Sequence, residues 1–146
     1  MPKAKEDEPD AMRKERIQKV LDDWIPRLSL TAWDITWELV DELKEDNNAS
    51  ARITPAFPYQ RAHIRFVRKA IDSAAIDAEL EIFVIHELNH LLIAPLWETI
   101  DFYLGESKVA NELHANIETL MDVMAMTFQT CWNQKWRGAL YSPVKE

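Results

Sequence analysis

An apolar segment from Ile82 to Trp97, which also carries two histidines and a glutamate, constrains this chain more than any other feature. A helix needs about 20 apolar residues to cross a bilayer, so the segment is too short and too polar for a membrane anchor. Its hydrophobic side chains recur at helical spacing, which predicts a buried helix that begins near Ile76 and ends at Pro95. Burying imidazole and carboxylate groups without a hydrogen-bond or metal partner costs free energy. We therefore expect these side chains to form a polar site within the core.

The polar residues of this helix form the sequence His86-Glu87-Leu88-Asn89-His90. Two histidines four positions apart differ by about 40° around a helix, so both imidazoles can bind one metal ion. Glu87 lies about 100° away, where it can take a proton from a water on that ion. Catalytic zinc keeps three protein ligands and an open position for water. The spacing therefore predicts a Zn²⁺ site at His86 and His90, with Glu87 as the catalytic base.

A metal-free interpretation of the same residues treats His86 and His90 as core histidines with hydrogen-bond partners. For a single histidine on an apolar helix that interpretation is the more common one. Two imidazoles that flank a glutamate on one buried helix favour the metal.

The third ligand should come from a later element that faces the histidines. A last long helix is expected from about Ser107 to Trp132, with an inward apolar stripe of Val109, Leu113, Ile117, Leu120, Met124 and Phe128. Glu112 borders this stripe, whereas Glu118 points more nearly toward solvent, so helical geometry favours Glu112. His114 and Glu118 remain the main alternatives in a candidate set of Glu98, Asp101, Glu106, Glu112, His114 and Glu118.

The rest of the chain predicts a small α+β domain. A helix capped by Asp10 is followed by three segments of strand character, Trp33 to Leu39, Ala51 to Thr54 and Arg61 to Val67. This order predicts helices packed on one face of a three-stranded antiparallel sheet. Residues 1–9 are expected to form a disordered tail, and residues 10–146 a single domain.

Charge and cysteine content limit the classes of partner and the cellular location that can be expected. The net charge of −8 argues against a nucleic-acid surface, which needs clustered Lys and Arg. Cys131 is the single cysteine and the N-terminal segment has no apolar stretch typical of a signal peptide, so a reducing, cytoplasmic location is expected. We expect no membrane partner, and a polypeptide substrate or a protein partner. His63 falls on the polar face of a strand and is interpreted as a surface residue.

The motif also resembles a known family. H-E-x-x-H followed about twenty residues later by N-E-x-x-x-(D/N) is similar to the gluzincin pattern of thermolysin-like enzymes, and this chain has Asn111-Glu112-Leu113-His114-Ala115-Asn116. Read as E-x-x-A-N, the segment is similar to the ImmA/IrrE-type metallopeptidases, and in size the chain resembles small phage and prophage zincin-like proteins. The resemblance implies a zincin-like fold and zinc-dependent peptide hydrolysis, with Glu112 as third ligand and Asn116 as a group that orients a ligand.

The resemblance has limits. The positions where a metzincin carries glycine and histidine are Ile93 and Leu96, which excludes that branch. Tyr103 and Tyr59 are the candidates for an oxyanion-stabilising group. By the same resemblance, the strand from Arg61 to Phe66 could pair with an extended peptide.

Three functions are consistent with these features. The first is a zinc metallopeptidase. The second is a catalytically silent metal-binding domain that acts through protein contacts, as a phage structural or regulatory protein. The third is a metal-free helical interaction module, which zinc in the purified protein would exclude.

Overall fold

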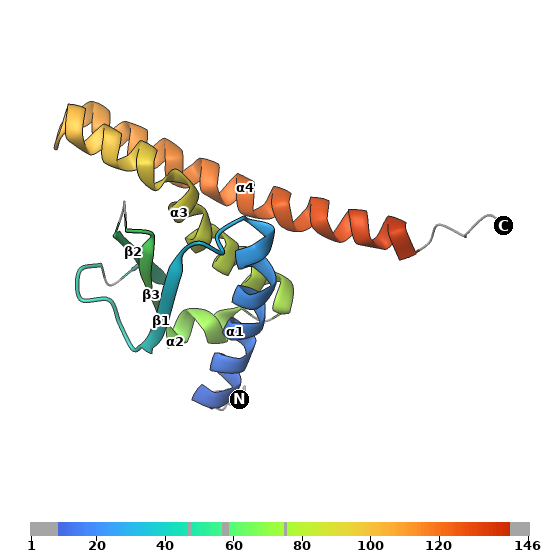
Figure 1. Cartoon of the computed structure of the whole chain (residues 1–146). Coiled ribbons are helices and arrows are strands. Elements are labelled where there is room, and N and C mark those ends of the chain that lie inside the picture. Colours follow the sequence, from blue (N-terminus) through green and yellow to red (C-terminus); the bar gives the residue numbers. More distant parts are fainter. Residues whose placement is uncertain (1–8, 47, 57–58, 75, 141–146) are drawn as a thin grey trace, which may run out of the picture.

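The computed structural model describes residues 9–46, 48–56, 59–74 and 76–140, with side chains up to Asn133. The predicted N-terminal tail lies outside these residues, apart from Pro9. Within them the chain forms four helices and three strands (Figure 1), in the order α1 (Asp10–Arg27), β1 (Asp34–Val40), β2 (Ala51–Ala56), β3 (Arg61–Val67), α2 (Arg68–Ser73), α3 (Asp77–Leu104) and α4 (Lys108–Leu140). The α+β class is confirmed, and the short helix α2 was not predicted.

The sheet has the strand order β1-β3-β2 and is mixed. β3 pairs antiparallel with β2 and parallel with β1, so the prediction of an antiparallel sheet was wrong. The connection between β1 and β2 is longer than a hairpin turn, and buried Leu43 anchors it to the domain. Because this connection is long, β2 lies at the other edge of the sheet, and β3 occupies the position beside β1.

The main core lies between one face of the sheet and helices α1 and α3. The alternation predicted for β3 is confirmed, because Ala62, Ile64 and Phe66 are buried. They pack with Ile17 and Leu21 of α1, and with the first half of α3, which contributes Leu80, Val84, Ile85, Leu88 and Leu91. The histidine-bearing segment is therefore held in place by the core of the domain.

Helix α3 does not end at Pro95, as predicted, but continues to Leu104. Proline removes one backbone hydrogen bond and normally kinks or ends a helix. Here the helix beyond Pro95 is held by a second apolar cluster, in which Ile93, Trp97 and Ile100 pack against α4. The length and apolar content of α3 as a whole would also suit a membrane span, although the first half of α3 forms part of the core. Gly105 follows with φ of 53°, a conformation that favours glycine, and turns the chain back into α4.

The buried face of α4 is rotated from the predicted stripe. Ile117 is buried as expected, whereas Val109 and Leu120 are 55% and 51% exposed. The helix instead buries Ala110, Ile117, Met121 and Ala125. Small alanines allow α4 to lie close to α3, so the contact face follows them and not the largest apolar side chains. The rotation, roughly 60° around the helix, changes which acidic residue meets the histidines.

Candidate metal centre

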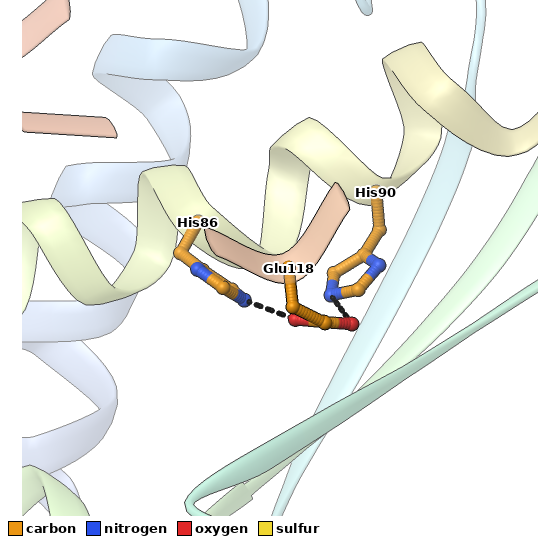
Figure 2. Close-up of side chains that lie close together, drawn as sticks. All are labelled: His86, His90 and Glu118. Atoms are coloured by element: carbon orange, nitrogen blue, oxygen red, sulfur yellow. Dashed lines mark ion pairs between the residues drawn. The ribbon is translucent and has the colours of Figure 1, made fainter. Parts of the chain in front are cut away.

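Helices α3 and α4 bring His86, His90 and Glu118 together (Figure 2). One ligand atom from each residue lies within 4.8 Å of the others. Nε2 of His86 is 3.3 Å from Oε2 of Glu118, and Nε2 of His90 is 3.7 Å from Oε1 of the same carboxylate. Both imidazoles thus direct the same ring nitrogen toward one carboxylate, an arrangement that leaves a common point for a cation.

A second carboxylate lies behind His86. Nδ1 of His86 is 2.8 Å from Oδ1 of Asp122, one helical turn beyond Glu118 on α4. When Nδ1–H donates to Asp122, the neutral ring keeps its lone pair on Nε2, the nitrogen that faces Glu118. Asp122 therefore selects the tautomer of His86 that can bind a metal ion.

The electrostatics of the three residues are linked. When His86 is protonated, its hydrogen bond to Glu118 lowers the pKa of the Glu118 carboxyl and raises the pKa of His86 against the effect of burial. Burial lowers the pKa of His90, which favours its neutral form. A neutral imidazole and an ionised carboxylate are the forms that bind a metal ion.

Glu87 is 5% exposed and lies on the same helix as the two histidines. Burial raises the pKa of its carboxyl to about 7, partly opposed by His86 and reinforced by Glu118. A carboxyl with a pKa near neutrality can accept and release a proton at physiological pH. We call His86, Glu87, His90, Glu118 and Asp122 the histidine cluster.

The cluster opens into a cleft of about 740 Å³ between α3 and the edge of the sheet. His86, Glu87, His90 and Glu118 all line it. The opposite wall comes from β2 and the segment before it, and the apolar lining includes Ala51, Ile53, Pro55, Phe83, Ala94 and Trp97. An extended chain segment could lie along β2 with its backbone close to the histidines.

The structure does not bring Glu112, the preferred third ligand, to the histidines. Its side chain is 64% exposed and its carboxylate lies 3.7 Å from Lys108, one turn earlier on α4. His114, an alternative, stacks on Trp97 at 4.1 Å and pairs with Asp101 at 3.1 Å. Glu118, which the predicted stripe turned toward solvent, occupies the place expected of the third ligand because α4 is rotated.

The other residues singled out in the sequence lie apart from the cluster. Tyr59 and Tyr103 are 79% and 76% exposed, and neither lines the cleft. Asn116 is exposed on α4. His63 lies on the polar face of β3, where it contacts Thr36 and Glu38. No oxyanion-stabilising role is supported for either tyrosine by this arrangement.

One sequence signal points to Glu118. The glutamate and aspartate of the gluzincin pattern, E-x-x-x-D, also match Glu118 and Asp122. One turn apart on α4, the two carboxylates reach the two sides of His86. The alanines at 110 and 125 were the matching signal for the face of α4 that meets α3.

The donor set fits zinc. Two imidazole nitrogens and one carboxylate oxygen are ligands that Zn²⁺ accepts, and a fourth position would face the cleft. The cluster holds three carboxylates but neither Lys nor Arg, so a divalent cation would compensate its negative charge. Other divalent ions that bind nitrogen and oxygen also fit this donor set.

No model of a known protein family matches this chain, and no curated protein or solved structure is similar to it at a significant level.

Proposed function

We propose that this protein is a zinc-dependent metallopeptidase in which His86, His90 and Glu118 hold the metal. One observation carries the proposal: a three-residue ligand set and a separate buried carboxyl, Glu87, line the same open cleft. A purely structural metal site is usually closed by four protein ligands, whereas a catalytic one keeps a position open. The H-E-x-x-H motif places Glu87 beside the ligands, as this chemistry requires.

Each residue has a role in this proposal. Zinc bound there would lower the pKa of a water molecule and polarise the scissile carbonyl. In this proposal Glu87 accepts the proton of the attacking water and delivers it to the leaving amine nitrogen. Asp122 holds His86 in the required tautomer.

The substrate in this proposal is a polypeptide that lies along β2. β3 has partners on both sides, so the expectation that Arg61 to Phe66 pairs with a peptide does not fit the strand order. β2 is an edge strand, and Pro55 within it has no N–H to give to β3. By the alternation of an antiparallel ladder, Ala51 and Ile53 also direct their backbone groups to the free edge. These residues line the cleft.

The test combines metal content with hydrolysis. Purified protein, Glu87→Gln and His86→Ala are compared for zinc per chain and for cleavage of a mixed peptide library, with Glu112→Gln as the matched control. We expect Glu87→Gln to keep zinc and lose about 10²- to 10⁴-fold in activity, the usual size of general-base catalysis. His86→Ala should lose both, and Glu112→Gln neither.

Two results would change the conclusion. Zinc binding by the wild type without cleavage of any peptide would favour the catalytically silent metal-binding domain. Wild-type protein that remains free of metal after incubation with Zn²⁺ would contradict both and leave the helical interaction module.

A further inference from the structure

Helices α3 and α4 form a two-helix arm, made of residues 92–104 and 108–127. Figure 1 shows the two helices side by side, with their shared end away from α1. Their contact is made by one row of residues from each helix, which includes Ile93, Trp97 and Ile100 on α3 and Ala110, Ile117 and Met121 on α4. The arm has further apolar residues that this contact does not use.

These residues fall, together with three uncharged polar residues, in one exposed row on each helix. On α3 the row is Leu92, Leu96, Thr99 and Tyr103, and on α4 it is Val109, Leu113, Asn116, Leu120, Val123 and Thr127. Positions in both rows alternate by four and three residues, the spacing of a seam between packed helices. Leu96, Leu120 and Val123 are 53%, 51% and 50% exposed. Each helix therefore presents a second packing seam that has no partner within the described part of the chain.

Both rows lie on the same side of the arm. Leu92 and Leu96 each precede a contact residue by one position, Ile93 and Trp97, and Val109 and Leu120 likewise precede Ala110 and Met121. Each row is therefore offset by about 100° from its contact face, in the same rotational sense. Because the two helices run antiparallel, equal offsets bring the rows onto one side. Together they form a single surface, which we call the arm face.

The arm face carries no charge, although 29% of the residues of this chain are charged and its net charge is −8. The buried centres of protein interfaces are depleted of charged residues in the same way. A strongly acidic chain would repel a second copy through most surfaces. At the arm face, two copies can meet without placing carboxylates opposite one another.

The two ends of the arm face differ in shape, since one projects and the other is hollowed. At the end near Gly105, the rings of Phe102 and Tyr103 project, 81% and 76% exposed. At the other end, Leu92 of the arm face lines a hollow of about 410 Å³. The other walls of this hollow come from α1, the turn after it and the later part of α4. They include Trp24, Leu28, Phe128 and Trp132. A two-fold axis near Leu96 would bring the projecting end of one copy to the hollow of the other, since such an interface is self-complementary.

We propose that the arm face is the dimer interface of this protein, with two arms packed antiparallel as a four-helix bundle. The α4 row spans roughly 27 Å and two helices are about 20 Å wide, so each copy contributes roughly 500 Å² and the pair buries about the 1,000 Å² that a specific interface needs. Phe102 or Tyr103 of each copy enters the hollow of the other. The proposal rests on the arm face and does not depend on metal or on peptidase activity.

Sedimentation equilibrium of the full-length protein tests the proposal directly, with and without a chelator. We expect the wild type to have twice the chain mass of 17.1 kDa at micromolar concentration. Leu96→Glu places two like charges near the two-fold axis and should give the monomer mass. Met12→Glu, at a 53% exposed position on α1, is the matched control and should leave the dimer intact.

Tyr103→Ala separates the shape argument from the apolar rows. We expect its dimer to dissociate at concentrations at least tenfold higher than for the wild type, with an unchanged circular dichroism spectrum. A monomeric wild type would overturn the proposal, as would a Leu96→Glu variant that still dimerises. A monomeric wild type that sediments with phosphatidylcholine vesicles would assign the arm face to a lipid surface instead.

Discussion

The charged cluster between α1 and α2 and the histidine cluster between α3 and α4 both gather several carboxylates, but they balance them differently. In the first, which we call the arginine cluster, Arg13 pairs with Asp10 and Asp72, and Arg68 pairs with Asp10 and Asp41. Protonated guanidinium groups are permanent cations, and Arg68 lowers the pKa of Asp10 to about 2. The histidine cluster has imidazoles in place of guanidinium groups.

This difference is the one expected between a structural arrangement and a functional one. In the arginine cluster each of the three carboxylates is paired with a permanent cation, and the cluster joins two helices that lie far apart in sequence. The histidine cluster has an excess of acidic groups, opens into a cleft and holds a carboxyl with a raised pKa. Perturbed ionisable groups in a cleft are typical of functional sites. Four substitutions test whether the two clusters differ in this way.

The largest expected effect is on metal affinity. Glu118→Gln removes the charged ligand, and we expect zinc affinity to fall by about 10³-fold, beyond the 10- to 100-fold typical of an outer partner. Glu112→Gln, on the exposed side of the same helix, should bind zinc like the wild type. Competition with a fluorescent chelator measures both. Equal losses in the two variants would indicate that the carboxylates act only through net charge.

The next effect is on the stability of the metal-free protein. Glu87 has a folded pKa of about 7 against an ordinary value of 4.5, so folding takes up a proton between these pH values. The wild type should therefore lose stability as pH rises from about 4.5 to 7. Glu87→Gln removes this loss, and we expect it to be more stable than the wild type by about 3 kcal/mol at pH 8 and by little at pH 4.

Urea unfolding in the presence of a chelator measures this difference at both pH values. A pH-independent gain would mean that the carboxyl is ionised in the folded state without cost. The opposite effects of this substitution, more stability and less activity, would distinguish Glu87 from the arginine cluster.

In the arginine cluster, Arg13→Ala should destabilise the protein by about 2–3 kcal/mol, because the buried guanidinium bonds to Asp72 and Asp10 are lost. The estimate lies below the 3–5 kcal/mol of a fully buried pair because Asp72 and Asp10 are 27% and 42% exposed and can be hydrated. Arg65→Ala, which removes a more exposed pair with Glu45, should cost less than about 1 kcal/mol. Zinc content should not change in either variant, and a loss of zinc in Arg13→Ala would link the clusters.

The smallest effect is expected at Asp122. Asp122→Asn keeps the shape of the side chain but weakens its hold on His86, so zinc affinity should fall by about 10-fold. Asp101→Asn makes the same substitution at a carboxylate that lies 3.1 Å from His114, outside the histidine cluster, and is the matched control. The same chelator competition applies. Unchanged affinity in Asp122→Asn would show that the tautomer of His86 is set without Asp122.

Local sequence patterns predicted the parts of the fold that depend only on residues close together in the chain. Strand Arg61–Val67 has the predicted bounds, and its apolar face is the buried one. His86, Glu87 and His90 lie on one helix, where their spacing alone fixes their relative directions. These features depend on periodicity and not on distant contacts.

The missed features depend on contacts between distant segments. β1 pairs parallel with β3 because of the path taken by the long connection between β1 and β2, and no local sequence pattern shows that path. The third ligand depends on the rotation of α4 around its own axis. The large apolar residues Val109, Leu113 and Leu120 belong to the exposed arm face, so they drew the predicted stripe away from the side that carries Glu118.

The division of the ligands between two helices has a mechanical consequence. His86 and His90 come from α3 and Glu118 from α4, and the backbone joins the two helices through the turn at Gly105, at the far end of the arm from the cluster. A bound ion is therefore a removable cross-link that closes the loop between His90 and Glu118. Closing a loop of this length restricts the unfolded chain, so loading the ion should tighten the helical pair, and chelation should let it fray before the sheet unfolds.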